Sequence, residues 1–272
     1  AFPYKQVMQE GLSAEDVLMR VAEISDYRKK HAAFSASAPK GHIRKGIGLS
    51  LALHGGGFTG SGEDKMNTTV KIVFEKGIFT LLTSAVDMGQ GSSTVLPMIA
   101  AERLGVSMDY ILHPFADTWV APNSGPTVAS RSTMFVGKVV DQACIKLIDK
   151  LKNYIANREG CPEKEVTFKK GFFHVNEEKI SIQKAAESFD QTHGELSIQC
   201  VYETDAASAW DEEKFEGTAY KGYGWIAQVV EVEVDTDTYE VNPIECFIVA
   251  EVGRAINPAL ATGQLEGGLL QG

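Results

Sequence analysis

A strand-to-helix turn at residues 87–94 constrains the fold of this chain more than any other stretch. The apolar, β-prone run 78–85 precedes the turn, and the run 95–104, which follows it and ends at Gly105, has the composition of a helix. The turn itself reads Asp-Met-Gly-Gln-Gly-Ser-Ser-Thr. Two glycines allow the backbone to approach a ligand, and a helix start offers unpaired N–H groups that suit an anion. The alternative is that the glycines only shape a tight turn.

A second stretch near the end of the chain has the same organisation. Residues 263–267 read Gly-Gln-Leu-Glu-Gly, follow the β-prone run 243–252 and open a helix-like segment. We therefore predict either a duplicated unit or two turns directed at one ligand, with Glu266 capping the helix start. Chance similarity is the alternative, because Gly-Gln is a common dipeptide.

A third stretch, residues 116–132, is an irregular loop rich in Ser, Thr, Pro and Gly. Loops of this length inside a domain are uncommon and usually functional. The loop leads into a helix predicted over residues 133–157, whose apolar residues fall on one face. Its last residues bring hydroxyl and N–H donors to the helix start, and Arg131 adds a cation, which favours an anion cradle. The alternative is an ordinary helix cap.

Composition limits the classes of partner and site. The net charge of -10 argues against a nucleic-acid or anionic-membrane partner, and no apolar run approaches the ~20 residues of a membrane span. The four cysteines form no C-x-x-C pair and the six histidines no H-E-x-x-H motif, so no metal site is predicted. We expect reduced, mostly buried thiols in a cytoplasmic protein.

Hairpins and helices alternate along the chain. Hairpins are predicted over 68–85 and 224–252, and a small βα excursion over 160–190. We therefore predict an α+β fold, a mixed β-sheet with helices packed on it, in a duplicated two-layer unit. Residues 1–42 are interpreted as an N-terminal helix, capped by Ser13, with its connector, and residues 43–272 as one further domain.

The motifs together resemble those of the xanthine dehydrogenase and aldehyde oxidoreductase family. Residues 87–91 are similar to its E/D-M-G-Q-G turn, and residues 122–132 to its P-N-x-x-P-T-A-A-S-x-S loop. Tyr223-Gly224, Asn257-Pro258 and residues 263–267 are similar to its C-terminal Y-G…N-P…G-Q-x-E-G signature. The order and spacing of these motifs agree from about Gly46 onward.

The resemblance implies a fold of the molybdenum cofactor-binding type and a set of site residues. These enzymes carry molybdenum on molybdopterin, as the pterin itself or as its dinucleotide. Ala129 is expected against the metal, and His54 and Phe58 near the substrate. The residues expected to bind the cofactor are Met88, Gly89, Gln90, Gly91, Val128, Ala129, Ser130, Ser132 and Gln264.

The resemblance also implies an activity. A xanthine dehydrogenase-like protein would hydroxylate a purine or related N-heterocycle with oxygen from water; an aldehyde oxidoreductase-type hydroxylase is the alternative. Its expected partners are the small-molecule substrate, iron–sulfur domains or subunits, in some members FAD, and further subunits of a homo- or hetero-oligomer. A non-catalytic scaffold or assembly subunit with the same fold is the alternative from another class.

The family's catalytic base is a glutamate in a G-x-G-E motif, which would lie beyond Gly272, so no catalytic residue is expected within this chain. We therefore predict that the chain purified alone holds no molybdenum and does not oxidise hypoxanthine, xanthine or benzaldehyde. Metal analysis and a dye-reduction assay test this expectation. Stoichiometric molybdenum or turnover in the isolated chain would contradict it.

Overall fold

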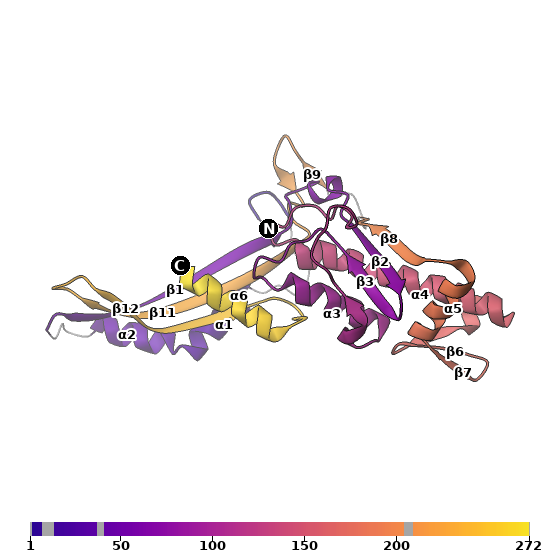
Figure 1. Ribbon diagram of the computed structural model, residues 1–272. Coiled ribbons are helices and arrows are strands. Elements are labelled where there is room, and N and C mark those ends of the chain that lie inside the picture. The colour runs from indigo at the N-terminus through magenta and orange to yellow at the C-terminus, as the bar shows by residue number, and fades with distance from the viewer. Residues whose placement is uncertain (1, 7–13, 37–40, 204–208, 272) are drawn as a thin grey trace. The chain divides into compact units, whose positions relative to one another are not determined.

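The computed structural model describes residues 2–6, 14–36, 41–203 and 209–271, and these form an α+β fold (Figure 1). The α+β class is as predicted, but the single mixed sheet is not. The strands form several small sheets that differ in strand number and order, so they give no support to a duplicated two-layer unit. None of the described helices is both long and apolar enough to cross a membrane.

The chain divides into two compact units. The first comprises residues 1–56, 215–255 and 265–272, and the second residues 57–214 and 256–264. The predicted boundary between residues 1–42 and 43–272 stays a prediction. Helix α6 (Pro258–Gln271) begins in the second unit and ends in the first.

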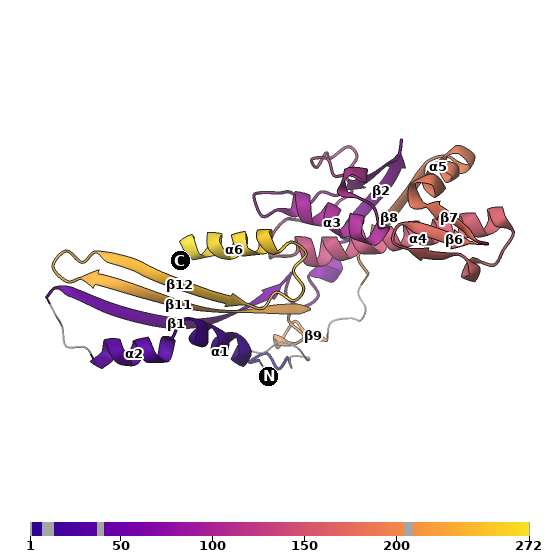
Figure 2. The same cartoon turned by 90° about the horizontal axis from the view of Figure 1, so that it is seen from below.

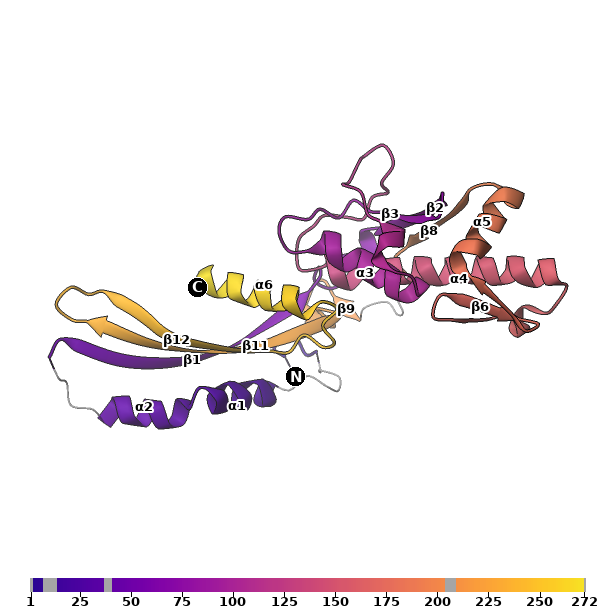
Figure 3. The same cartoon turned by 60° about the horizontal axis from the view of Figure 1, so that its bottom comes forward.

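The first unit is built on a long antiparallel sheet with two helices on one face (Figure 3). Its strands, in spatial order, are β1 (Ile43–Gly56), β11 (Gly222–Asp235) and β12 (Val241–Ala250), and its helices are α1 (Ala14–Ile24) and α2 (Tyr27–Ala36). Val17 and Val21 of α1 are buried together with Ala227 and Val229 of β11. The single helix predicted within residues 1–42 is therefore two, separated near Asp26, whose φ is 52°. The predicted cap Ser13 lies outside the described residues.

The second unit holds the larger core. Its principal sheet has the order β4 (Ile111–Leu112), β3 (Ile78–Leu82), β2 (Thr69–Glu75) and β8 (Leu196–Val201). Helices α3 (Ser92–Leu104) and α4 (Gly137–Glu159) pack against each other, as Figure 2 shows. The predicted apolar stripe of α4 faces this core, in which Val140, Ala143, Leu147, Leu151 and Ile155 are fully buried. The 3-10 turn Met108–Tyr110 leads directly into β4.

The remaining elements are short. The small predicted excursion is a three-stranded antiparallel sheet followed by a helix: β5 (Thr167–Lys169), β6 (Phe172–Val175), β7 (Glu178–Ser181) and α5 (Ile182–His193). Strands β9 (Trp210–Asp211) and β10 (Glu216–Gly217) are two residues each. All four cysteines are free; Cys144 and Cys200 are buried, Cys161 is half-buried and Cys246 is exposed. The expectation of mostly buried thiols therefore fails for Cys246.

Two glycines end helices in the same left-handed conformation but in different surroundings. Gly105, after α3, has φ 64° and Gly160, after α4, has φ 66°. A Cβ at Gly105 would lie 2.2 Å from the backbone nitrogen of Gly171, whereas a Cβ at Gly160 would meet nothing within 4 Å. Comparing these two positions therefore separates the energetic cost of the left-handed conformation from the cost of close backbone packing.

We predict that Gly160→Ala lowers the free energy of unfolding by about 1 kcal/mol, the cost of a left-handed alanine. Gly105→Ala should cost about 3 kcal/mol or more, because the backbones at residues 105 and 171 must also separate. Urea-induced unfolding of the two variants measures the difference. Equal losses would show that the approach of these backbones does not constrain the fold.

Candidate functional site

Three segments of the second unit, far apart in the sequence, are joined by hydrogen bonds. The Val86 N–H donates to the Thr127 hydroxyl (2.9 Å), which ties the turn after β3 to the loop before α4. The Gly57 N–H donates to the Ala129 carbonyl (2.8 Å), which ties the glycine-rich segment after β1 to the same loop. Segments 86–91, 124–131 and 57–63 therefore form one local cluster.

The start of α3 is capped by the side chain of Asp87. Its Oδ1 accepts hydrogen bonds from the N–H groups of Gly89 (2.9 Å) and Gly91 (3.2 Å), and its Oδ2 accepts one from the Ser93 N–H (2.8 Å). The bonds from Ser93 and Gly89 lower the pKa of Asp87. The prediction that these N–H groups are left for an external anion is therefore wrong, because the chain supplies its own carboxylate.

Gln90 also bonds within the turn. Its Oε1 accepts from the Met88 N–H (2.6 Å), and its Nε2 donates to the Val86 carbonyl (2.8 Å) and the Ser92 hydroxyl (3.2 Å). The side chain of Met88 is 70% exposed and Gly89 is exposed as well. Met88 and Gly89 are therefore exposed, although their N–H groups bond within the turn, and the Gln90 amide holds the turn in shape.

The loop before α4 presents three consecutive exposed residues, Val128, Ala129 and Ser130. Ala129 and Ser130 have φ angles of 54° and 52°, the left-handed region that residues with a Cβ avoid. The N–H groups of Ala129 and Ser130 and the Ser130 hydroxyl make no hydrogen bond to any residue that the structure describes. Unpaired donors held in a strained conformation suit a polar ligand.

The residues that follow turn back into the core. Arg131 is 1% exposed and forms an ion pair with Glu63, so the expectation that it supplies a cation to an external anion is wrong. Half-buried Ser132 begins the π-helical turn η3 (Ser132–Val136), which leads directly into α4. π-Helical turns are rare in proteins, and those that do occur are often found at functional sites.

The second Gly-Gln pair is not at a turn. Helix α6 begins at Pro258, and the Asn257 side chain accepts from the Leu260 N–H (3.1 Å) as its cap. Gln264 and Glu266 consequently lie inside the helix, so the predicted turn and the predicted cap by Glu266 are both wrong. The Asn-Pro pair supplies a cap and a first-turn proline, which is why the helix starts earlier.

The start of α6 nevertheless lies against the α3 turn. A Cβ at Gly91 would lie 2.9 Å from Cδ1 of Leu260. Gln264 is exposed and follows Leu260 by four residues, so it shares the same helix face about 6 Å further along. Leu260 thus brings the start of α6 against the α3 turn, while the expectation that both Gly-Gln stretches face one ligand stays a prediction, since Gln264 is not at a helix start.

The two residues expected near a substrate lie in different units. His54 is exposed on β1, opposite Gly224 of β11. Phe58 is half-buried in the second unit, where its N–H donates to Glu63 Oε1 (3.1 Å). Glu63 and the capping role of Asp87 were missed at the sequence level. The Glu63-Asp64-Lys65 run after the glycine-rich segment and the single Arg131 in the Ser/Thr/Pro-rich loop are the signal that could have revealed the pairing of Glu63 with Arg131.

The cluster offers hydrogen-bond donors rather than a constellation for acid–base or metal chemistry. Within the described part of the chain, no group of three or more His, Cys, Asp or Glu side chains could hold a metal ion. Its unpaired donors are the N–H groups of Ala129 and Ser130 and the Ser130 hydroxyl, while its charged groups, Asp87, Glu63 and Arg131, bond internally. This arrangement fits the binding of a ligand rich in hydrogen-bond acceptors.

Comparisons with known proteins agree on one family. A model described as "Molybdopterin cofactor-binding domain" matches residues 20–272. A xanthine dehydrogenase of Emericella nidulans is 30% identical over 270 residues, covering 99% of this chain and 17% of that protein. A probable xanthine dehydrogenase subunit of Bacillus subtilis is 27% identical, covering 84% of this chain and 30% of that protein.

Solved structures show the same fold at lower identity. A reconstituted CO dehydrogenase from Oligotropha carboxidovorans superposes with a TM-score of 0.81 at 19% identity, over 96% of this chain and 33% of that chain. The aldehyde oxidoreductase from Desulfovibrio desulfuricans gives a TM-score of 0.69 at 22% identity, over 96% of this chain and 26% of that one. The chain thus spans a third or less of the length of these proteins.

We predict that Asp87→Ala lowers the free energy of unfolding by about 1 kcal/mol at neutral pH, because three N–H groups lose their acceptor. Since the pKa of Asp87 is lowered on folding, its stabilisation is complete above the unfolded-state pKa of about 3.9. It should disappear as pH falls through the lower folded-state pKa. Urea unfolding of wild type and variant between pH 3 and 7 tests the profile.

Asp117→Ala is the matched control, because the Asp117 carboxylate accepts a single N–H, that of Trp119 (2.9 Å), in an exposed loop. It should cost much less than Asp87→Ala. Equal costs for the two variants, or a difference between wild type and Asp87→Ala that persists undiminished at pH 3, would contradict the capping role.

Proposed function

This chain belongs to the family of molybdopterin cofactor-binding domains, and on that premise we propose that its donor cluster holds part of the molybdenum cofactor of a xanthine dehydrogenase-like hydroxylase. The observation that carries the proposal is the exposed segment 128–130, whose unpaired donors stand beside the turn 86–91. A pterin presents ring nitrogens and a carbonyl oxygen, and its tail a phosphate, all of which accept hydrogen bonds. The cluster fits such a group.

The proposed roles follow from which atoms are left available. The N–H groups of Ala129 and Ser130 and the Ser130 hydroxyl donate to the cofactor, and the small side chain of Ala129 leaves room for the metal. Val128, Ser132 and Gln264 line the same site. Met88 and Gly89 line the site with exposed surface, because their N–H groups already bond within the turn, while Gln90 and Gly91 keep the turn in shape. The cofactor phosphate is expected away from the α3 start, because the Asp87 carboxylate already occupies it.

When bound, the molybdenum cofactor would supply the redox and oxygen-transfer chemistry, and this chain would bind and orient it. The proposed reaction is hydroxylation of a purine or related N-heterocycle with oxygen from water, with His54 and Phe58 near the substrate. The names of the relatives support a purine. Similarity to the Desulfovibrio protein favours an aldehyde as the second candidate.

The proposed partners follow from coverage. The Bacillus relative is named as a subunit, which supports iron–sulfur and FAD groups carried on other domains or chains. The cytoplasm is the proposed location, and the base that activates the oxygen donor is proposed to lie outside this chain.

We predict that Ala129→Leu in the full-length protein sharply lowers molybdenum and pterin content, because a branched side chain would project from the exposed donor segment. Gln90→Ala should lower the content less, since it removes hydrogen bonds that hold the turn, worth about 1–3 kcal/mol. Plasma mass spectrometry for molybdenum and fluorescence of the oxidised pterin, each per chain, measure occupancy.

Ala116→Leu makes the same substitution at an exposed position of the preceding loop and should leave occupancy unchanged. Wild-type cofactor content in both Ala129→Leu and Gln90→Ala would refute the assigned roles. Turnover of wild type with hypoxanthine, xanthine and benzaldehyde then separates the two substrate classes. A fully loaded wild type that oxidises benzaldehyde alone would exclude the purine assignment.

A further inference from the structure

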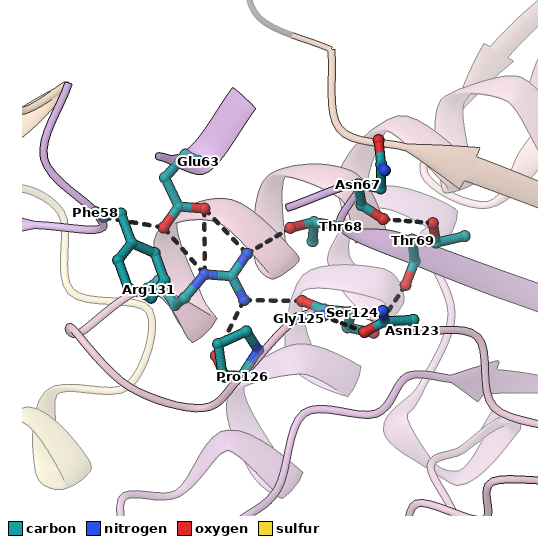
Figure 4. Close-up of polar contacts among 10 residues, drawn as sticks. All are labelled: Phe58, Glu63, Asn67, Thr68, Thr69, Asn123, Ser124, Gly125, Pro126 and Arg131. Carbon is teal, nitrogen blue, oxygen red and sulfur yellow. Dashed lines mark hydrogen bonds and ion pairs between the residues drawn. The ribbon is translucent and has the colours of Figure 1, made fainter. Parts of the chain in front are cut away.

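A buried ion pair lies directly behind the exposed donor segment. Arg131 and Glu63 are each 1% exposed at the side chain, and their charged atoms approach to 3.0 Å. Arg131 directly follows Ser130 in the sequence. The Arg131 side chain is buried in the core, whereas Ser130 is exposed. Figure 4 shows the guanidinium at the centre of its contacts.

All five N–H groups of Arg131 have acceptors. Its Nε lies 3.0 and 3.1 Å from the two Glu63 carboxylate oxygens, and one Nη donates to Glu63 Oε2 and to the Thr68 hydroxyl. The other Nη donates to the carbonyls of Ser124 (2.8 Å) and Pro126 (3.2 Å). Glu63 also accepts the Phe58 N–H, so the pair is fully satisfied.

These bonds close the loop into a ring. The guanidinium at residue 131 holds the carbonyls at residues 124 and 126, so the intervening backbone has both ends fixed. The ring packs tightly, since a Cβ at Gly125 would lie 2.9 Å from Nη1 of Arg131. The Gly57 N–H holds the Ala129 carbonyl from the side. The two left-handed residues, Ala129 and Ser130, belong to this ring and are exposed to solvent.

Stability alone does not account for such a pair. Burying two charges removes their hydration, and apolar residues of similar volume often stabilise a fold as well or better. What an apolar pair cannot do is bind two loop carbonyls and a hydroxyl at once. A planar fork of five donors provides that function, and a lysine ammonium does not.

We propose that Arg131 and Glu63 are positioning residues that hold Ala129 and Ser130 in their left-handed conformation, ready for the cofactor before it binds. This inference rests on the proposed function, because it takes the segment 128–130 to be the cofactor-facing surface. The pair itself does not touch the ligand. It acts by keeping the donors of Ala129 and Ser130 outward and the loop closed, so that binding does not have to order the segment.

The test compares three variants of the full-length protein. Glu63→Gln combined with Arg131→Met removes both charges, keeps an acceptor for the Phe58 N–H and leaves the two loop carbonyls unheld. Arg131→Lys keeps the charge but loses the fork. Arg103→Lys is the matched control: Arg103 makes two bonds to Asp141 (2.5 and 2.9 Å), but these join α3 to α4 at the surface, away from the ring.

Amide hydrogen exchange is read by mass spectrometry in protein from cells that cannot make the cofactor. For the double variant and Arg131→Lys we expect the hydrogen-bonded amides within residues 124–132, those of Ser124, Gly125 and Arg131, to exchange about tenfold faster or more, with residues 182–193 of α5 unchanged. In cofactor-producing cells, their molybdenum and pterin content per chain should fall about tenfold, because the binding-competent loop is less populated. The double variant should keep a near-wild-type unfolding midpoint, and Arg103→Lys should match wild type throughout.

Unchanged exchange in residues 124–132, or full cofactor content in the folded double variant, would overturn the positioning role. So would an acceleration spread evenly over the second unit, because that result marks a merely structural pair. A wild type that holds no molybdenum in cofactor-producing cells would refute the proposed function instead. The exchange measurement would then still decide whether the pair holds the loop.

Discussion

The second unit depends on the burial of one face of α4. Val140, Ala143, Leu147, Leu151 and Ile155 leave no exposed area, so a shift of the helix along or about its axis would bring apolar surface into water. The start of the helix is fixed by the same packing. The loop before η3, and η3 itself, lead directly into that start. The position of the exposed residues 128–130 therefore depends on a core several helical turns away.

Much of this arrangement was readable from the sequence because it follows from hydrophobic period and turn chemistry. The apolar stripe of α4, the hairpin within residues 68–85 and the strand-to-helix turn before α3 were all predicted correctly. Each depends on residues within a short window, so local rules suffice. The sheets were less predictable, since strands such as β2 and β8 pair across more than a hundred residues.

The polar partners of the site were not predictable by the same rules. A helix start shows where unpaired N–H groups will be, but not whether the chain fills them itself, as Asp87 does. A charged residue in a loop is usually solvated, and only the three-dimensional fold brings Glu63 to Arg131 across 68 positions. The predicted start of α6 was wrong because the Asn257-Pro258 cap, and not the Gly-Gln pair, begins the helix.

Two hydrogen bonds between Ser84 and Ser124 hold the two ends of a long segment together. Each serine hydroxyl accepts the backbone N–H of the other, at 3.0 and 2.7 Å, across 40 positions of sequence. Loop-closure entropy rises only slowly with length, so an exposed loop between fixed ends tolerates insertion or deletion with little strain on the rest of the fold. The exposed loop around Phe115 and Trp119 lies between these two serines in the sequence. The ring closed by Arg131 begins at Ser124 and follows that loop. The exposed loop around Phe115 and Trp119 is therefore free to vary in length and composition, while residues 128–130 keep their geometry.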